Sequence, residues 1–174
     1  MRFLSTILVF CFVAGGLSAQ VYTGPKWAPS NFDTTVAGNY RGAKITSRAQ
    51  LDSMKNIYGV HTVLNLAKDA LPKSGKTEIE WSEELGMKYV SVYLGNRPPS
   101  EEKWEMIKSM LDSGGVYVHC HHGADRTGAI LAMYRIEREG YTPQQAYKEA
   151  RKYGFKSWNT YLREWIGYPK SAEK

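Results

Sequence analysis

The sequence predicts a single α/β domain with a central, mostly parallel sheet flanked by helices. Short apolar runs over 60–66, 88–94 and 116–119 have the length and composition of buried strands. Longer segments between and after them place apolar residues at helical spacing. Strands that alternate with helices in this way are typical of a parallel sheet with helices packed against it.

The first half of the chain supplies most of the predicted strands. Segment 20–37 is rich in Pro, Gly, Ser and Thr, so we expect an extended lead-in, followed by a short strand around 39–41. A helix is predicted from a Ser47 cap through Tyr58, where Gly59 ends it. Four elements follow in order: the strand 60–66, a polar loop 68–76, a short helix 78–85 and the strand 88–94.

Helices dominate the second half. Ser100 is predicted to cap a helix that stops at Gly114. Another helix is predicted over about 127–139, after the strand 116–119, and Thr142 caps the next one, with a proline in its first turn. The last helix is predicted over 155–166, with a core-facing apolar face made of Trp158, Tyr161, Leu162 and Trp165.

Composition and charge fit one globular domain. The chain has 174 residues, of which 43% are hydrophobic and 13% aromatic, and this argues against disorder. The formal net charge is +6, and modest basicity suits an anionic substrate. No block of five or more Lys and Arg residues occurs, so we predict no nucleic-acid partner.

Residues 1–19 have the pattern of a secretory signal peptide. Arg2 gives a positive start, the apolar stretch 3–13 follows, and cleavage is predicted after Ala19. The apolar run is short for a membrane span, so we expect an exported protein, periplasmic or secreted, without stable membrane insertion after cleavage; a retained anchor is the alternative. The predicted organisation is a signal peptide 1–19, an extended segment 20–37, a catalytic domain 38–168 and a tail 169–174.

Cysteine content supports a functional thiol. Cys11 would leave with the signal peptide, so the mature chain would keep Cys120 and form no internal disulfide. A lone thiol is a liability in an oxidising compartment, which favours a functional interpretation of Cys120. The alternative is a small buried residue.

The segment VYVHCHHGADRTGA, residues 116–129, carries the predicted chemistry. A loop that turns from a strand into a helix points successive N–H groups into one concavity, and the helix dipole makes this an anion site. Gly123 lets the backbone curl, and Arg126 can offer paired donors to phosphate oxygens. The same positive field should lower the pKa of Cys120, and a thiolate beneath a phosphoryl group is an in-line nucleophile.

This segment resembles the signature loop of the cysteine-dependent phosphatases, which include the protein tyrosine and dual-specificity phosphatases. Segments 40–42, 60–67 and 140–146 are also similar to small dual-specificity-like phosphatases, so the resemblance covers roughly 38–166. Five positions fall at the family's spacing: His119, Cys120, Gly123, Arg126 and Thr127.

The resemblance implies a role for each position. Cys120 would be the nucleophile, and Arg126 would bind phosphate and stabilise the transition state. Thr127 would hydrogen-bond the thiolate and assist its departure, while His119 would orient the loop and tune Cys120. No metal or cofactor is implied, because Arg126 and backbone dipoles supply the positive charge. The phosphate-binding residues would be His121, His122, Gly123, Ala124, Asp125 and Arg126.

The chain lacks an Asp at the position where the family usually carries the proton donor for the leaving oxygen. The donor's usual loop corresponds to 95–100, which contains no Asp. Asp125 is the best substitute, since a similar Asp occurs in the signature loops of myotubularin-like and some bacterial lipid-active phosphatases. Asp69 is the second candidate and Glu101 the third. A loop-bracing or capping role for Asp125 stays open.

Four other charged side chains have two interpretations each. His121 and His122 either add positive charge near an acidic substrate or are exposed loop residues without a special task. Arg41 either contacts the signature loop or a second phosphate, or forms a surface ion pair. Arg97 either reaches the substrate or is a solvated charge.

The predicted function is hydrolysis of phosphate monoesters through a cysteinyl-phosphate, with phosphotyrosine or a related phosphoprotein as the default substrate. A phosphoinositide or an inositol phosphate is the alternative substrate. A phosphate-binding module without catalysis is the non-enzyme alternative, and the missing Asp in 95–100 is its support. A redox or sulfur-transfer role is weak, because the mature chain has no second cysteine.

Overall fold

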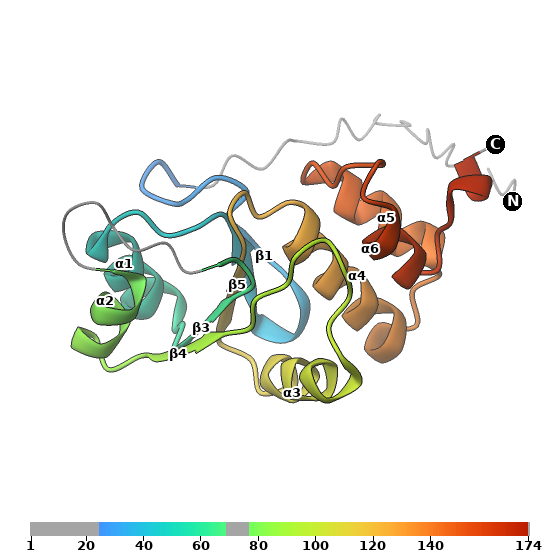
Figure 1. Ribbon diagram of the computed structural model, residues 1–174. Helices are drawn as coiled ribbons and strands as arrows, with labels where there is room; N and C mark the ends of the chain where they lie inside the picture. Colours follow the sequence, from blue (N-terminus) through green and yellow to red (C-terminus); the bar gives the residue numbers. More distant parts are fainter. Residues whose placement is uncertain (1–24, 69–76, 174) are drawn as a thin grey trace, which may run out of the picture.

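Five strands form one sheet in the order β1-β2-β5-β3-β4 (Figure 1). The computed structural model describes residues 25–68 and 77–173. β1 pairs with β2 in antiparallel fashion, and every other pair is parallel, so the predicted α/β class with a mostly parallel sheet is confirmed. The strands are β1 (Asp33–Thr34), β2 (Tyr40–Gly42), β3 (Thr62–Asn65), β4 (Lys88–Ser91) and β5 (Val116–His119).

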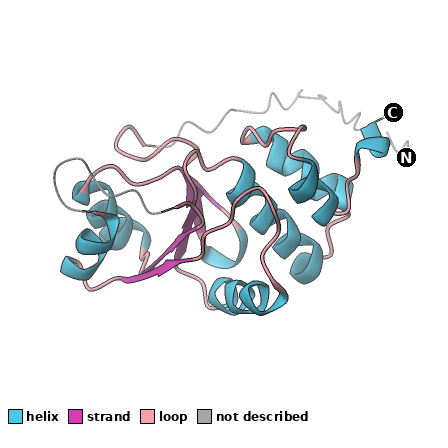
Figure 2. Cartoon of the chain, viewed as in Figure 1, coloured by secondary structure: helices cyan, strands magenta, loops and turns pink. Residues whose placement is uncertain are grey.

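Helices cover both faces of this sheet (Figures 1 and 2). α1 and α2 lie on one side, whereas α3, α4, α5 and α6 lie on the other. The α-helices are α1 (Arg48–Tyr58), α2 (Glu78–Glu84), α3 (Glu101–Asp112), α4 (Asp125–Glu139), α5 (Pro143–Lys152) and α6 (Thr160–Trp165), with 3₁₀ turns η1 (Val36–Gly38) and η2 (Lys170–Glu173).

The hydrophobic core has a layer on each face of the sheet because successive strand residues point in opposite directions. Val63 and Tyr117 join the layer under α1 and α2. Their neighbours Leu64 and Val118 join the layer under α3 and α4. A third layer lies between α4, α5 and α6, so the helix that follows the candidate site is held from both sides.

The predicted helix ends are mostly confirmed. Thr142 forms a capping box with Gln145, and the Ser100 hydroxyl accepts from the N–H of Lys103. Gly59 ends α1 in a left-handed conformation, which glycine adopts without steric cost. Ser47 stands at the predicted N-cap position of α1, but its side chain makes no cap hydrogen bond.

The last helix is shorter than predicted. It begins at Thr160 instead of 155, because Gly154 is left-handed and Phe155 turns inward to pack against Tyr147. The five residues before α6 therefore form a turn. Trp158 is 73% exposed, so its predicted place on a core-facing helix stripe is also wrong.

The segment before residue 38 packs onto the domain. β1, which the sequence did not indicate, pairs with β2 through the turn η1. Phe32 is 3% exposed and packs against Trp27 and Tyr58. The packed unit therefore extends upstream of the boundary predicted at residue 38.

The predicted signal peptide lies outside the described residues, so export stays a prediction. Within the part of the chain that the structure describes, no helix has both the length and the apolarity needed to cross a bilayer.

The buried side-chain amide of Asn39 connects three segments of the chain. Asn39 is fully buried, and its Nδ2 donates to the carbonyl oxygens of Val36 (2.9 Å) and Leu111 (2.8 Å). Its Oδ1 accepts from the N–H of Val116 at 3.0 Å, at the first residue of β5. One side chain thus fixes η1, the end of α3 and the strand that leads to Cys120.

We expect Asn39→Leu to lower the free energy of unfolding by about 2 kcal/mol, because the N–H of Val116 and the carbonyls of Val36 and Leu111 lose their partner, while the branched shape of the side chain is kept. Urea unfolding monitored by circular dichroism measures this change. Asn56→Leu, on the exposed side of α1, is the matched control and should change stability by less than about 0.5 kcal/mol. Equal losses in the two variants would contradict the assignment.

Candidate active site

Cys120 directly follows β5. β5 is the middle strand of the sheet, and the thiol residue is 2% exposed. α4 begins at Asp125, two residues earlier than predicted, so Asp125 and Arg126 belong to its first turn. The loop between them is thus a short connection from a parallel strand into a helix N-terminus, which is a favourable place for an anion.

The loop lies directly on the backbone of β2. Gly123 has a φ of +67°, and a Cβ there would lie 2.4 Å from the carbonyl of Gly42. No other residue type fits this position without displacing the strand. Arg41 reaches the same glycine from behind, since its Nη2 donates to the Gly123 carbonyl at 2.6 Å. Of the interpretations left open for Arg41, contact with the signature loop is the one observed.

Three consecutive loop carbonyls are bound from outside. The His121 oxygen accepts from the N–H of Lys44 (3.3 Å), and the His122 oxygen accepts from Asn31 Nδ2 (2.9 Å). The Gly123 oxygen accepts from Arg41, as described above. In a trans peptide the carbonyl and the next N–H point in opposite directions. The following N–H groups, of residues 122–124, therefore point away from these donors, and the N–H of His122 is one of the groups that lower the pKa of the Cys120 thiol.

Arg41 is itself held in a buried polar network. Its guanidinium lies 3.6 Å from the centre of the Tyr153 ring, and the Tyr153 hydroxyl donates to Asp33 Oδ2 at 2.8 Å. Burial lowers the pKa of Arg41 to about 10, against the charges of Tyr153, Glu149, Cys120 and Asp33, which raise it. The guanidinium is therefore still positive at neutral pH.

The thiol of Cys120 has a lowered pKa. Burial acts to raise it, but the hydroxyl and N–H of Thr127, the N–H of His122 and the charge of Arg126 together outweigh burial. Thr127 is fully buried, and its hydroxyl has no hydrogen-bond partner among the described residues, so it is available to the thiolate. The site thus favours a thiolate.

Arg126 and Arg97 contact different parts of the chain around the loop 95–100. Arg126 is half-buried, and its Nη1 lies 3.4 Å from the carbonyl of Leu94, just before the loop 95–100. Arg97, within that loop, places its guanidinium 4.4 Å from the centre of the Tyr161 ring. The two cations therefore tie the loop to the phosphate-binding helix and to α6, respectively.

His119 links the loop to α2. Its ring is buried and stacks on Tyr117, with Nδ1 3.3 Å from the carbonyl oxygen of Cys120. Nε2 lies 3.2 Å from one carboxylate oxygen of Glu78, whose other oxygen accepts from the N–H of Ile45 at 2.6 Å. This position fits the loop-orienting role implied for His119.

The candidate proton donors are placed differently. Asp125 Oδ1 accepts from the N–H of Lys156 at 2.7 Å, which ties the turn before α6 to the first turn of α4. Glu101 is exposed at the start of α3, and Asp69 lies outside the described residues. Of the three, Asp125 is the carboxylate adjacent to Arg126.

The predicted site residues His119 to Thr127 lie in and around the signature loop, and other segments of the chain support that loop. The sequence did not indicate the supporting residues, since each lies far along the chain and carries no motif. Among residues 25–68 and 77–173 no group of three or more His, Cys, Asp or Glu side chains is arranged to hold a metal ion. The supporting residues that sequence reasoning missed are Asn31, Asp33, Glu78, Tyr153 and Lys156.

Comparison with known proteins agrees with this geometry. A family model described as "polymorphic toxin system, DSP-PTPase phosphatase" matches residues 37–140, which contain the whole loop. The chain belongs to the dual-specificity phosphatase family. It is therefore a cysteine-dependent phosphatase, which hydrolyses phosphate monoesters through a cysteinyl-phosphate, and the non-catalytic alternative is not supported.

Relatives of this phosphatase come from Pseudomonas aeruginosa. The chain is 48% identical to the dual specificity protein phosphatase TpbA of strain PAO1 over 168 residues, and 26% identical to TpbA of strain UCBPP-PA14. Both alignments cover 89% of this chain and 73% of the relative.

Solved structures share the fold. The crystal structure of P. aeruginosa TpbA matches with a TM-score of 0.60 and 24% identity, covering 86% of this chain and 98% of that one. The catalytic core of the PP-IP phosphatase SIW14 from S. cerevisiae matches with a TM-score of 0.63 and 17% identity, covering 84% and 89%. The predicted resemblance to dual-specificity phosphatases is thus confirmed.

We expect the rate of Cys120 alkylation by iodoacetamide to rise with pH through a midpoint below that of a free thiol, because only the thiolate reacts. Thr127→Val keeps the shape but removes the hydroxyl, so its midpoint should move upward. Mass analysis of the peptide that contains Cys120 gives the rates.

Thr34→Val, at an exposed position in β1, is the matched control and should leave the midpoint unchanged. An identical midpoint in the Thr127 and Thr34 variants would show that the hydroxyl does not act on the sulfur.

Proposed function

We propose that this phosphatase dephosphorylates phosphotyrosine in proteins, with Cys120 as the nucleophile and Arg126 as the phosphate ligand. One observation carries the proposal: a buried thiol with a lowered pKa lies at the base of a loop whose carbonyls are bound from behind. The N–H groups and Arg126 then face the same space, where a phosphate dianion would be held.

The reaction has two steps. The Cys120 thiolate attacks phosphorus, the bond to the tyrosine oxygen breaks, and Asp125 gives that oxygen its proton. Water then attacks the phosphorus of the cysteinyl-phosphate, Asp125 takes the proton, and the P–S bond breaks. The Thr127 hydroxyl stabilises the departing thiolate, and Arg126 holds the equatorial oxygens in both steps.

The placement of Asp125 supports its role as proton donor. The bond from the Lys156 N–H to Oδ1 fixes the orientation of the carboxyl group and leaves Oδ2 to exchange the proton. The same bond is also what a purely loop-bracing Asp125 would make, so the two roles need an experiment that separates them. Asp69 and Glu101 are the other candidate donors.

The choice of substrate rests on relatives. The TpbA proteins are named dual specificity protein phosphatases, and one TpbA structure contains phosphotyrosine. Structural neighbours also include SIW14, a PP-IP phosphatase, and a PTPMT1 complex with PI(5)P. An inositol phosphate or phosphoinositide is therefore the second candidate substrate.

We also propose that the phosphatase acts outside the cytoplasm. This rests on the signal-peptide pattern of residues 1–19. The substrate would then be an exported or surface phosphoprotein.

We expect Cys120→Ser to lose turnover of a phosphotyrosine peptide by about 10⁴-fold or more, while binding is kept, because the hydroxyl fits the loop but is not ionised. Fluorescence anisotropy of the labelled peptide measures binding, and phosphate release measures turnover. Wild type should form a cysteinyl-phosphate that survives acid quenching.

Parallel assays with phosphoserine peptides and inositol phosphates determine which class of substrate the phosphatase prefers. A higher kcat/KM for an inositol phosphate than for every phosphotyrosine peptide would contradict the protein-substrate proposal.

We expect Asp125→Asn to lower kcat for the phosphotyrosine peptide by 10²-fold to 10⁴-fold. The kcat for p-nitrophenyl phosphate should fall much less, because its good leaving group needs little protonation. Asn still accepts the Lys156 N–H, so bracing is kept. Asp125→Ala removes both the proton and the brace.

If Asp125 acted as a brace alone, Asn would behave like wild type on both substrates, and Ala would lose activity and thermal stability. Steady-state kinetics and thermal melts of the two variants therefore separate the roles.

A further inference from the structure

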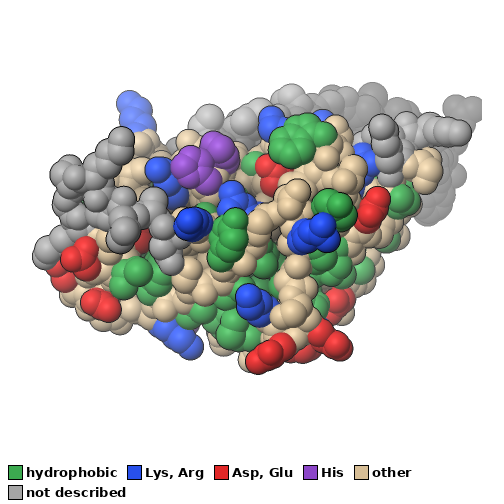
Figure 3. Space-filling model, in the orientation of Figure 1, with side chains coloured by type: hydrophobic (Ala, Val, Ile, Leu, Met, Phe, Trp, Pro, Cys, Tyr) green, Lys and Arg blue, Asp and Glu red, His purple; other side chains and the backbone are tan. Residues whose placement is uncertain are grey.

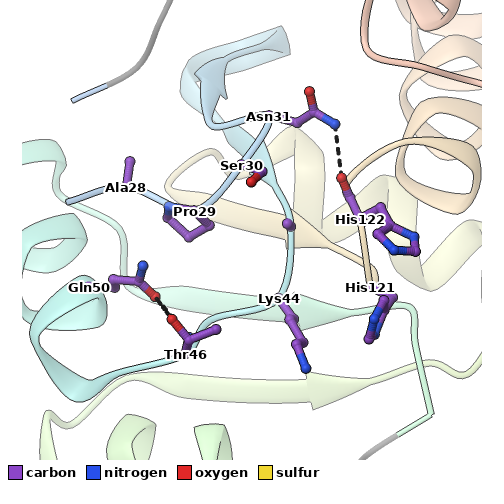
Figure 4. A pocket seen from close by; sticks show the side chains of 10 residues that line it. Ala28, Pro29, Ser30, Asn31, Lys44, Thr46, Gln50, His121 and His122 are labelled. Atoms are coloured by element: carbon purple, nitrogen blue, oxygen red, sulfur yellow. Dashed lines mark hydrogen bonds between the residues drawn. The ribbon is translucent and has the colours of Figure 1, made fainter. Parts of the chain in front are cut away.

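A pocket lies beside the phosphate-binding loop, on the side of β2 (Figure 4). Its volume is about 520 Å³. Three segments form it: the stretch before β1, the stretch after β2 with the start of α1, and the signature loop, which is distant from the other two in the sequence. The lining residues are Ala28, Pro29, Ser30, Asn31, Ala43, Lys44, Thr46, Gln50, His121 and His122.

The walls of this pocket are built from internal hydrogen bonds. Gln50 Oε1 accepts from the N–H of Thr46 at 2.8 Å, and its Nε2 donates to the carbonyl of Trp27 at 3.0 Å. The N–H of Ala43 donates to the Ser30 carbonyl at 2.8 Å. Because these groups are already bonded to each other, the pocket is formed before a ligand arrives.

The pocket is positively charged where it meets the phosphate site. Lys44 and His121 project side by side in Figure 4, and the rings of His121 and His122 are in edge contact at 4.5 Å. None of the ten lining residues is acidic. Among the described residues the Lys44 ammonium has no ion-pair or hydrogen-bond partner. In Figure 3 histidine side chains lie beside Lys and Arg side chains on the face shown.

This charge is continuous with the catalytic cradle. Burial lowers the pKa of His121, and the charges of His122, Lys44 and Arg126 lower it further. Lys44 is also bonded through its own N–H to the His121 carbonyl. The ring of His121, in the signature loop, is therefore within electrostatic reach of both Lys44 in the pocket and Arg126 in the phosphate site.

We propose that this pocket is a second anion site, which binds an acidic side chain of the peptide that flanks the phosphotyrosine. The proposal rests on the proposed function, since the flank reaches the pocket when phosphotyrosine occupies the cradle. The pocket offers one permanent cation, Lys44, the two histidine rings, and apolar surface from Ala28, Pro29 and Ala43. This suits a single carboxylate on an apolar stem better than a polyphosphate, which needs several permanent cations.

Matched peptides test the site. Each peptide carries one phosphotyrosine and one Glu, and the Glu is placed in turn at each of the three positions before and after the phosphotyrosine. Each peptide is compared with an otherwise identical peptide that has Gln in place of Glu. At low salt we expect wild type to prefer the best Glu peptide by roughly threefold to fivefold in kcat/KM. The preference should vanish in 0.5 M salt, as screening requires. It should grow as the pH falls below 6.5, because the pKa of His121 is lowered from that value and the ring gains its proton there.

Three variants assign the effect to Lys44. Lys44→Met keeps the length of the side chain and should bring the Glu/Gln ratio close to 1, and Lys44→Glu should bring it below 1. Lys148→Met, at an exposed position in α5, is the matched control and should keep the wild-type ratio. The Glu/Gln ratio is taken within each variant, so a change in turnover of the phosphate group itself, measured with p-nitrophenyl phosphate, cancels from the ratio.

The outcomes separate the two proposals. Normal turnover of p-nitrophenyl phosphate and phosphotyrosine peptides, with a Glu/Gln ratio of 1 at every position or a ratio that Lys44→Met does not change, overturns the second site alone. A dependence on Lys44 for an inositol polyphosphate but for no peptide overturns the choice of a peptide ligand. Failure to hydrolyse any phosphotyrosine peptide overturns the proposed function and this proposal together.

Discussion

The hydrogen bond from Arg41 to the Gly123 carbonyl is the contact on which the site depends. A carbonyl that turned into the loop would repel both a phosphate dianion and the Cys120 thiolate. Arg41 holds this carbonyl outward, and Gly123 permits the approach because it has no side chain. The fold thus builds an anion site by binding loop carbonyls from behind, which leaves the N–H groups free on the inner side.

Burying an arginine for this purpose requires further contacts. The Tyr153 ring covers the guanidinium, and Asp33 accepts the Tyr153 hydroxyl, so β1 and the end of α5 both support the loop. An unpaired buried cation would be strongly destabilising. The short strand β1 is therefore more than an edge of the sheet, since it supplies the carboxylate that completes this network.

Prediction from sequence succeeded where the information is local. Cys120, Arg126 and Thr127 lie within eight positions of one another between a strand and a helix, and that spacing alone places them on one loop. The predicted start of the last helix at residue 155 was wrong. The left-handed Gly154 interrupts the helix there, and Phe155 packs beside Gly128 instead. Prediction left the role of Arg41 open between contact with the loop and other roles, because that contact spans 82 residues and depends on strand order.

The same loop gives the site two faces of different chemistry. Its inner face presents N–H groups and Arg126 to a phosphate, while its outer carbonyls bind Lys44, Asn31 and Arg41. The bond from the backbone N–H of Lys44 to the His121 carbonyl also fixes where the Lys44 side chain starts, and the charges of Lys44 and Arg126 both act on His121. A segment recruited to shape the cradle therefore brings a second positive charge beside it, and specificity for the flanking sequence can arise from the contact that organises catalysis.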